Sequence, residues 1–169
     1  MSIRMNRQNW TDIIESGKYI VDETDSVFIG QPLRYKGSTS GSGAPAYTKY
    51  MRVQGYTDTT SVERCLGVSE DQIILGSGAA FQALRNLEWR WIRRDVAVCL
   101  HGDREMINME SGYDAAPNDL VAPYPGGFVA YQTGMCILGK VKSGPIAFAQ
   151  RGMIAIDVQY YNATAAHWP

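Results

Sequence analysis

Apolar and polar positions alternate along several short stretches of this chain, which is the period of a β-strand with one buried face. The clearest case is residues 153–161, MIAIDVQYY, where Ile154, Ile156, Val158 and Tyr160 fall on one face. Glycine, proline, asparagine and aspartate separate such stretches at intervals of about 8 to 12 residues. The pattern predicts further strands at residues 47–56, 62–68, 96–100, 104–109, 120–124, 127–131 and 136–141.

Many short strands joined by turns are typical of a mainly β fold, and we expect a compact β-barrel or β-sandwich. One or two short helices are expected beside it. The first would span residues 11–17, with Thr11 or Asp12 as its N-cap. The second would follow the candidate cap Ser77, because SGAAFQALRNLEW places apolar residues at helical spacing. The stretch 89–95 could continue that helix or form a strand.

The chain divides into an N-terminal arm, residues 1–24, and a single β domain, residues 25–169. The arm is polar with isolated large apolar residues, and a helix as short as residues 11–17 does not hold by itself. Its apolar side chains therefore need a surface to pack on, either the β domain or another chain. Residues 37–45, GSTSGSGAP, have too little apolar surface to order themselves and predict a flexible loop.

The stretch 99–106, CLHGDREM, is the most enzyme-like part of the sequence, because it combines a thiol, a histidine, an arginine and carboxylates. Catalysis or metal binding would require His101 to meet a nucleophile or further ligands. The other histidine is His167, and no serine or cysteine carries a nucleophile motif such as GxSxG. The dipeptide Gly-Asp instead favours a tight hairpin at residues 101–103. We therefore predict a turn between two strands, with no catalytic, metal or cofactor site.

Composition narrows the function classes. The sequence has 16 basic and 17 acidic side chains, so its net charge indicates no polyanionic partner. Cys65, Cys99 and Cys136 lack CxxC spacing and are expected to be buried, reduced thiols. The sequence starts with no secretory leader, and no apolar run approaches the ~20 residues of a membrane-spanning helix. We expect a protein made in the cytoplasm, without a membrane partner.

Aromatic and basic residues gather at residues 88–95, EWRWIRRD. Side chains of this kind could stack bases and neutralise phosphates of a single-stranded nucleic acid. The flanking acidic residues nearly match the charge, however, and tryptophan beside arginine is enriched at protein–protein interfaces. We favour an interface and expect no direct nucleic-acid binding. The candidate partner-contact residues of the whole chain are Trp10, Ile13, Ile14, Tyr19, Trp89, Arg90, Trp91 and Trp168.

The order of these motifs resembles that of a family of small tailed-bacteriophage head proteins, the capsid decoration or cement proteins. The resemblance is carried by Gly30, Gly67-Val68, residues 96–102, Asn118-Asp119-Leu120-Val121, Leu138-Gly139-Lys140 and residues 154–158. It extends over roughly two thirds of the chain. Residues 70–92 do not follow the family pattern, so they look like an insertion.

The resemblance implies an assembly function for a compact β-barrel or sandwich, without a cofactor. Proteins of this family are usually trimers that dock on the outer surface of the mature head and oppose the pressure of packaged DNA. The implied partners are the major capsid protein and further copies of this chain, and the implied location is the virion. A polar arm with isolated apolar anchors suits such docking, and three copies that bind together strengthen a weak contact.

Two other functions remain open at this point. The same β architecture and aromatic content would suit another phage structural protein, in the tail, the baseplate or host attachment. The second alternative is a small β-barrel that binds single-stranded nucleic acid through Trp89, Arg90, Trp91 and Arg93. Retention of an oligonucleotide that falls with added salt would favour that alternative.

Overall fold

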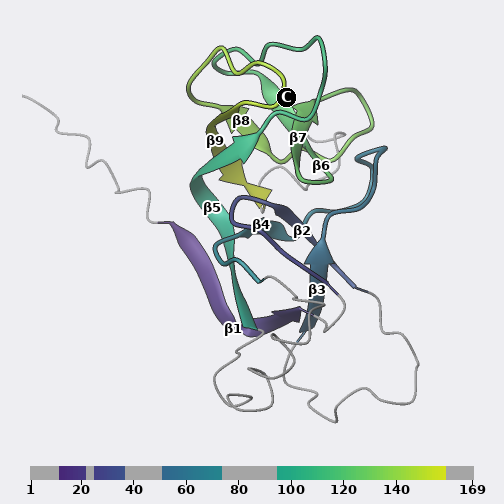
Figure 1. Cartoon of the computed structure of the whole chain (residues 1–169), viewed down its shortest axis with the longest axis vertical. Helices are drawn as coiled ribbons and strands as arrows, with labels where there is room; N and C mark the ends of the chain where they lie inside the picture. Colours follow the sequence, from purple (N-terminus) through teal and green to yellow (C-terminus); the bar gives the residue numbers. More distant parts are fainter. Residues whose placement is uncertain (1–11, 22–24, 37–50, 74–94, 159–169) are drawn as a thin grey trace, which may run out of the picture.

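The computed structural model describes residues 12–21, 25–36, 51–73 and 95–158, and the structural statements below concern these residues (Figure 1). Nine strands make up their regular structure, which confirms the predicted mainly β fold. None of these residues belongs to a helix long and apolar enough to cross a membrane. The strands are β1 Ile13–Val21, β2 Pro32–Tyr35, β3 Met51–Gly55, β4 Gly67–Ser69, β5 Asp95–Ile107, β6 Leu120–Tyr124, β7 Gly127–Ala130, β8 Gly139–Val141 and β9 Arg151–Asp157.

Five of the strands close into a barrel. Their order is β1-β3-β2-β4-β5, and β5 pairs again with β1 to complete the ring. β1 runs parallel to β3 and antiparallel to β5. Because side chains alternate along a strand, every second residue at the start of β5 enters the barrel. The barrel core consists of Tyr19, Val21, Val27, Leu33, Val53, Val96, Val98 and Leu100.

The thirteen-residue strand β5 continues beyond the barrel and carries a second unit, the outer module, formed by residues 102–158. There β5 pairs with β9, and the sheet continues through β8 and β6 to β7. The sheet curls back on itself, because Phe128 of β7 bridges to Asn108 just after β5. In Figure 1 the barrel and the outer module lie one above the other, joined by the curved β5.

The outer module has its own apolar core, which extends onto the outside of the barrel. Val68 of β4 and Cys99 of β5 belong to this second cluster, so the two units share a packed boundary. Such shared packing and the continuous β5 hold the two units together. The side chains of the outer module in this core include Met106, Ala115, Val121, Phe128, Leu138, Val141, Ile146, Ile154 and Ile156.

The alternation of apolar and polar residues predicted several strands at their correct positions. β6 occupies the predicted stretch 120–124, and β7 occupies all but the last residue of 127–131. In β9 and just after it, Ile154, Ile156 and Val158 are buried, as their common face predicts. These strands were predictable because turn residues mark both ends and one face is continuously apolar.

Other predictions need correction. Residues 13–17 form the start of β1 and not a helix, because residues 13–15 pair with β5, and Gly17, at φ 71°, lies where the register between the two strands shifts. Residues 13–21 of the expected arm are therefore a barrel strand. The predicted strand 62–68 begins only at Gly67. The loop 37–45, the helix after Ser77 and most of residues 70–92 lie outside the described residues.

Candidate functional site

The enzyme-like stretch CLHGDREM lies in the middle of β5, where the strand leaves the barrel for the outer module. The prediction of a hairpin at residues 101–103 is wrong, because β5 continues through these residues without reversing its direction. Cys99 pairs with Val68 inside the barrel wall, and from His101 onward the strand pairs with β9. Gly102 does adopt a positive φ of 138°, but this conformation redirects a strand and does not reverse it.

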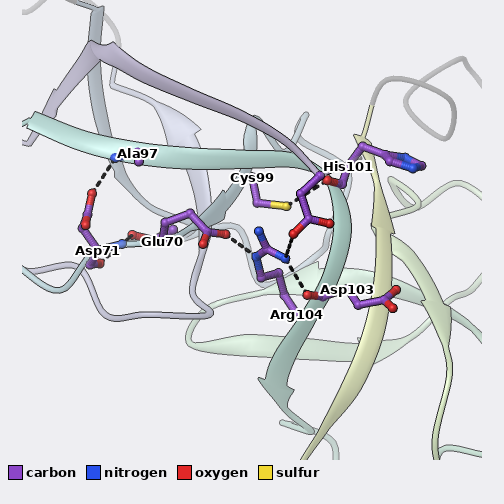
Figure 2. A network of polar contacts seen from close by, with 9 residues as sticks. Glu70, Asp71, Ala97, Cys99, His101, Asp103 and Arg104 are labelled. Carbon is purple, nitrogen blue, oxygen red and sulfur yellow. Dashed lines mark hydrogen bonds and ion pairs between the residues drawn. The ribbon is translucent and has the colours of Figure 1, made fainter. Parts of the chain in front are cut away.

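Arg104 is the centre of a polar network at this crossing (Figure 2). Its Nη1 lies 3.0 Å from Oδ2 of Asp12, which immediately precedes β1, and its Nε donates to Glu70, which follows β4. Nη1 also donates to the carbonyl oxygen of Asp103 at 2.6 Å. The Arg104 side chain is only 15% exposed, so these charge-assisted bonds form in a partly desolvated place. The guanidinium on β5 thus connects the residue before β1 with the residue after β4.

The electrostatics of Arg104 follow from these partners. Burial alone would lower the pKa of its guanidinium, but hydrogen bonds to Glu70 and Asp12 raise that pKa above its usual value. Asp12 can approach because Gly102 has no side chain: a Cβ there would collide with the Asp12 carboxylate. The glycine that suggested a turn therefore provides the space in which the network forms.

A second set of bonds fixes the segment after β4 against the barrel half of β5. The N–H of Glu70 donates to the carbonyl oxygen of Ala97 at 2.9 Å, and the N–H of Ala97 donates to Oδ2 of Asp71 at 2.7 Å. Figure 2 shows the contact between Ala97 and Asp71 on the side of the network away from His101. Glu70 is therefore held by its backbone while its carboxylate reaches Arg104.

The other chemistry-bearing side chains of the stretch point to separate partners. His101 Nδ1 lies 3.4 Å from Oδ2 of Asp157 in β9, and its ring points away from Arg104 (Figure 2). Asp103 Oδ2 lies 2.5 Å from Nζ of Lys142. The Cys99 thiol donates to the carbonyl oxygen of His101, and burial raises its pKa to about 11. The thiol, the imidazole and the carboxylate do not converge on one point, so the geometry joins strands rather than arranging a nucleophile with a base.

Metal ligation and thiol chemistry were the remaining catalytic options. Within the described ranges, no group of three or more histidine, cysteine, aspartate or glutamate side chains could hold a metal ion. Cys65, Cys99 and Cys136 form no disulfide within the described part of the chain; Cys65 and Cys99 are buried, as predicted, whereas Cys136 is partly exposed. Desolvation raises the pKa of all three thiols, that of Cys65 to about 12. Thiols with raised pKa values carry little thiolate at neutral pH and are poor nucleophiles.

Three of the predicted partner-contact residues lie in the described part of the chain, and they differ in exposure. Ile13 and Ile14 at the start of β1 are 44% and 45% exposed, although adjacent residues of a strand face opposite sides. The prediction that Tyr19 contacts a partner needs correction, because Tyr19 is only 3% exposed and packs in the barrel core. Residues Trp10, Trp89, Arg90, Trp91 and Trp168 lie outside the described part of the chain.

Further exposed apolar side chains were missed by the sequence reasoning. Phe28 and Ile29 project from a tight turn whose Gly30 lies against the backbone of Glu105. An aromatic and an aliphatic residue directly before a turn glycine was the available signal, since turn tips are seldom buried. The remaining large apolar residues with high exposure are Tyr35, Met51, Val62, Phe148 and Met153.

The likeness of this chain to known proteins is weak and concerns the fold. No protein-family model matches the chain, and no curated protein matches it. Among solved structures, the base of the head fiber gp8.5 of bacteriophage phi29 is similar at 11% sequence identity and a TM-score of 0.48. The match covers 87% of this chain and 95% of that one.

Proposed function

We propose that this chain is a structural protein of a tailed-phage head, a decoration or cement protein. It would bind the outer surface of the mature capsid as a trimer and stabilise the shell against the pressure of packaged DNA. The proposal rests mainly on one observation, which is the position in the fold of the motif residues that carry the family resemblance. The physical form of the molecule and its exposed apolar residues give further support.

The motif residues occupy positions that the backbone geometry requires. Gly30, Gly67 and Gly139 each lie so close to the backbone of a neighbouring strand that a Cβ would collide with a carbonyl oxygen. Asn118 has a positive φ of 75° directly before β6, a conformation that asparagine tolerates. These residues therefore lie at or near the beginnings of strands. Their order along the chain is the order on which the family resemblance rests.

The shape of the molecule suits a binding role on a large assembly. The barrel and the outer module share β5 and a packed boundary, so surfaces on both units are held in a fixed relation. Ile13 and Ile14 lie at the start of β1, where both faces of the strand are exposed. Exposed aliphatic residues on a rigid strand can be buried on binding at about 25 cal/mol per Å² of apolar area.

Binding to isolated heads tests this proposal. The purified chain is mixed with expanded and with unexpanded heads of the phage that encodes it, and the bound fraction is measured by co-sedimentation. We expect a trimer that binds expanded heads to saturation and ignores unexpanded ones. A monomer that sediments with neither form would contradict the proposal.

A matched pair of variants locates the contact. Ile13→Ser with Ile14→Ser removes two exposed aliphatic side chains of β1, and Val62→Ser removes one that is exposed elsewhere. We expect the first variant to bind expanded heads at least tenfold more weakly, with unchanged thermal stability. The Val62→Ser control should bind like the original chain. Equal binding by both variants would remove Ile13 and Ile14 from the contact.

A further inference from the structure

The outer module contributes most of the lining of a hollow of about 300 Å³. Met109 and Glu110, just after β5, line it together with Tyr124, Val129 and Met135, and Thr59 of the loop between β3 and β4 also reaches it. The volume is at the lower limit of small-ligand pockets, so a single side chain is a more suitable occupant than a large molecule.

Glu110 is held in the wall of this hollow by the backbone. Its N–H donates to Oδ1 of the buried Asn108 at 3.1 Å, and its Oε2 accepts from the N–H of Ala130 at 2.9 Å. No basic side chain in the described part of the chain forms an ion pair with Glu110. The structure therefore presents a fixed carboxylate, without a cationic partner among the described residues, in the lining of this hollow.

The surroundings strengthen the negative field. Tyr113 donates to Oδ2 of Asp119 at 2.8 Å. Burial raises the pKa of Tyr113, and so do the hydrogen bond to Asp119 and the negative charges of Asp119 and Glu110. A cation that enters the hollow would thus meet the negative charge of Glu110, which also acts on Tyr113.

We propose that this hollow receives a lysine or arginine side chain of the protein on which the chain docks, an inference that rests on the proposed function. The aliphatic stem of such a side chain would contact Met109 and Met135, whose unbranched thioethers adapt to varied shapes. The cationic group would pair with Glu110 and lie near the ring of Tyr124, where a cation–π contact can add to the attraction. A neutral apolar side chain would leave the carboxylate unpaired.

Small probes test the hollow independently of any phage head. N-acetyl-arginine amide and N-acetyl-lysine amide are titrated against the full chain with labelled methionine methyl groups, and N-acetyl-norleucine amide is the uncharged control. We expect the two cationic probes to shift the Met109 and Met135 resonances, with dissociation constants on the order of 1 mM. The norleucine probe should leave those resonances in place. Equal shifts with all three probes, or shifts elsewhere only, would overturn the proposal.

Glu110→Gln is the matched variant, because its amide oxygen can still accept from the N–H of Ala130 while the charge is lost. It should weaken both cationic probes at least tenfold, whereas Glu105→Gln, an exposed site on β5, should not. On expanded heads, Glu110→Gln should bind more weakly than Glu105→Gln. Head binding by Glu110→Gln at the original strength would overturn the assignment of the hollow and leave the head function standing. Failure of the original chain to bind heads would contradict the proposed function instead.

Discussion

The barrel and the outer module are stabilised in different ways, although one strand runs through both. The barrel is closed by strand pairing around an aliphatic core of valine and leucine with one tyrosine. The outer module has a strand ladder as well, but long loops connect its strands, and one buried polar side chain, Asn108, holds two of these loops. Asn108 donates to the carbonyl oxygens of Tyr113 and Ile146 at 2.7 and 2.9 Å. The outer module thus adds side-chain hydrogen bonds to its ladder.

Both the barrel and the outer module depend on the strand β5. Its first half completes the barrel, its second half begins the outer module, and Gly102 lies at the change of partner. Arg104 adds a polar connection from this point to Asp12 and Glu70 on the barrel side. We therefore expect the two units to unfold together despite their different cores.

The largest expected effect comes from matched cavities in the two cores. Leu33 in the barrel and Leu138 in the outer module are both fully buried. Either leucine-to-alanine change should lower the free energy of unfolding by about 3 kcal/mol, from lost burial and the cavity left behind. Urea unfolding followed by two probes, one in each unit, should show a single transition in both variants. Separate transitions for the two units would show that β5 does not couple them.

The second prediction concerns Gly102, the residue at which β5 changes its partner strand. Gly102 and Gly112 both have positive φ, but only at Gly102 would a Cβ meet other atoms, those of Asp12 and Arg104. Gly102→Ala should cost about 3 kcal/mol and Gly112→Ala about 1 kcal/mol, because the second change carries backbone strain alone. Chemical denaturation of the two variants measures the difference. Similar costs would mean that the contact between Asp12 and Gly102 has no energetic importance.

A third change tests the polar support of the outer module. Asn108→Ala would leave two carbonyl oxygens and the N–H of Glu110 without this partner, at a cost of about 2 kcal/mol. Hydrogen exchange should become faster in the loops around Tyr113 and Ile146 before it changes in the barrel. Gln132→Ala, at an exposed position, is the control and should change neither quantity. Uniformly faster exchange in both units would contradict a local role.

The smallest effect is a pH dependence in the loop between β3 and β4. Although some burial opposes it, Asp58 accepts hydrogen bonds from Thr60, Val62 and Glu63, and these lower its pKa to about 2 from the usual 3.8. A depressed carboxyl pKa stabilises the folded state above the unfolded pKa, and this contribution is lost as the pH falls from about 4 to about 2.

Asp58→Asn should therefore cost about 1 to 2 kcal/mol at pH 7 and little at pH 2. Unfolding free energies measured across that range, against Asp114→Asn as an exposed control, give the comparison. A cost for Asp58→Asn that does not change with pH would show that the loop does not depend on the ionised carboxylate.

Sequence patterns predicted local features of the outer module better than the course of β5. β6 was recognisable because Asp119 precedes it and Pro125 and Gly126 follow it, so its bounds are local information. At Gly102 the same kind of signal was misleading, since partners far apart in the chain decide whether a glycine turns a strand or redirects it. The closing pair of β1 with β5 overrode the local preference at residues 13–17 for the same reason.

The candidate site was less predictable for a related physical reason. The partners of Arg104, Asp12 and Glu70, are separated from it by 92 and 34 residues, and no periodic pattern connects them. The hollow beside Glu110 is likewise assembled from loops at the ends of several strands. The sequence left open whether Ile13 and Ile14 pack on the β domain or on another chain, and the burial of Tyr19 required the barrel to be known.

The binding of this chain to the outside of a mature phage head, as we propose, can be seen by electron cryomicroscopy of heads saturated with the chain. We expect additional trimeric density on the outer surface of expanded heads, at three-fold positions between capsomers. Density confined to a tail or baseplate, or no density on heads at saturating concentration, would contradict it.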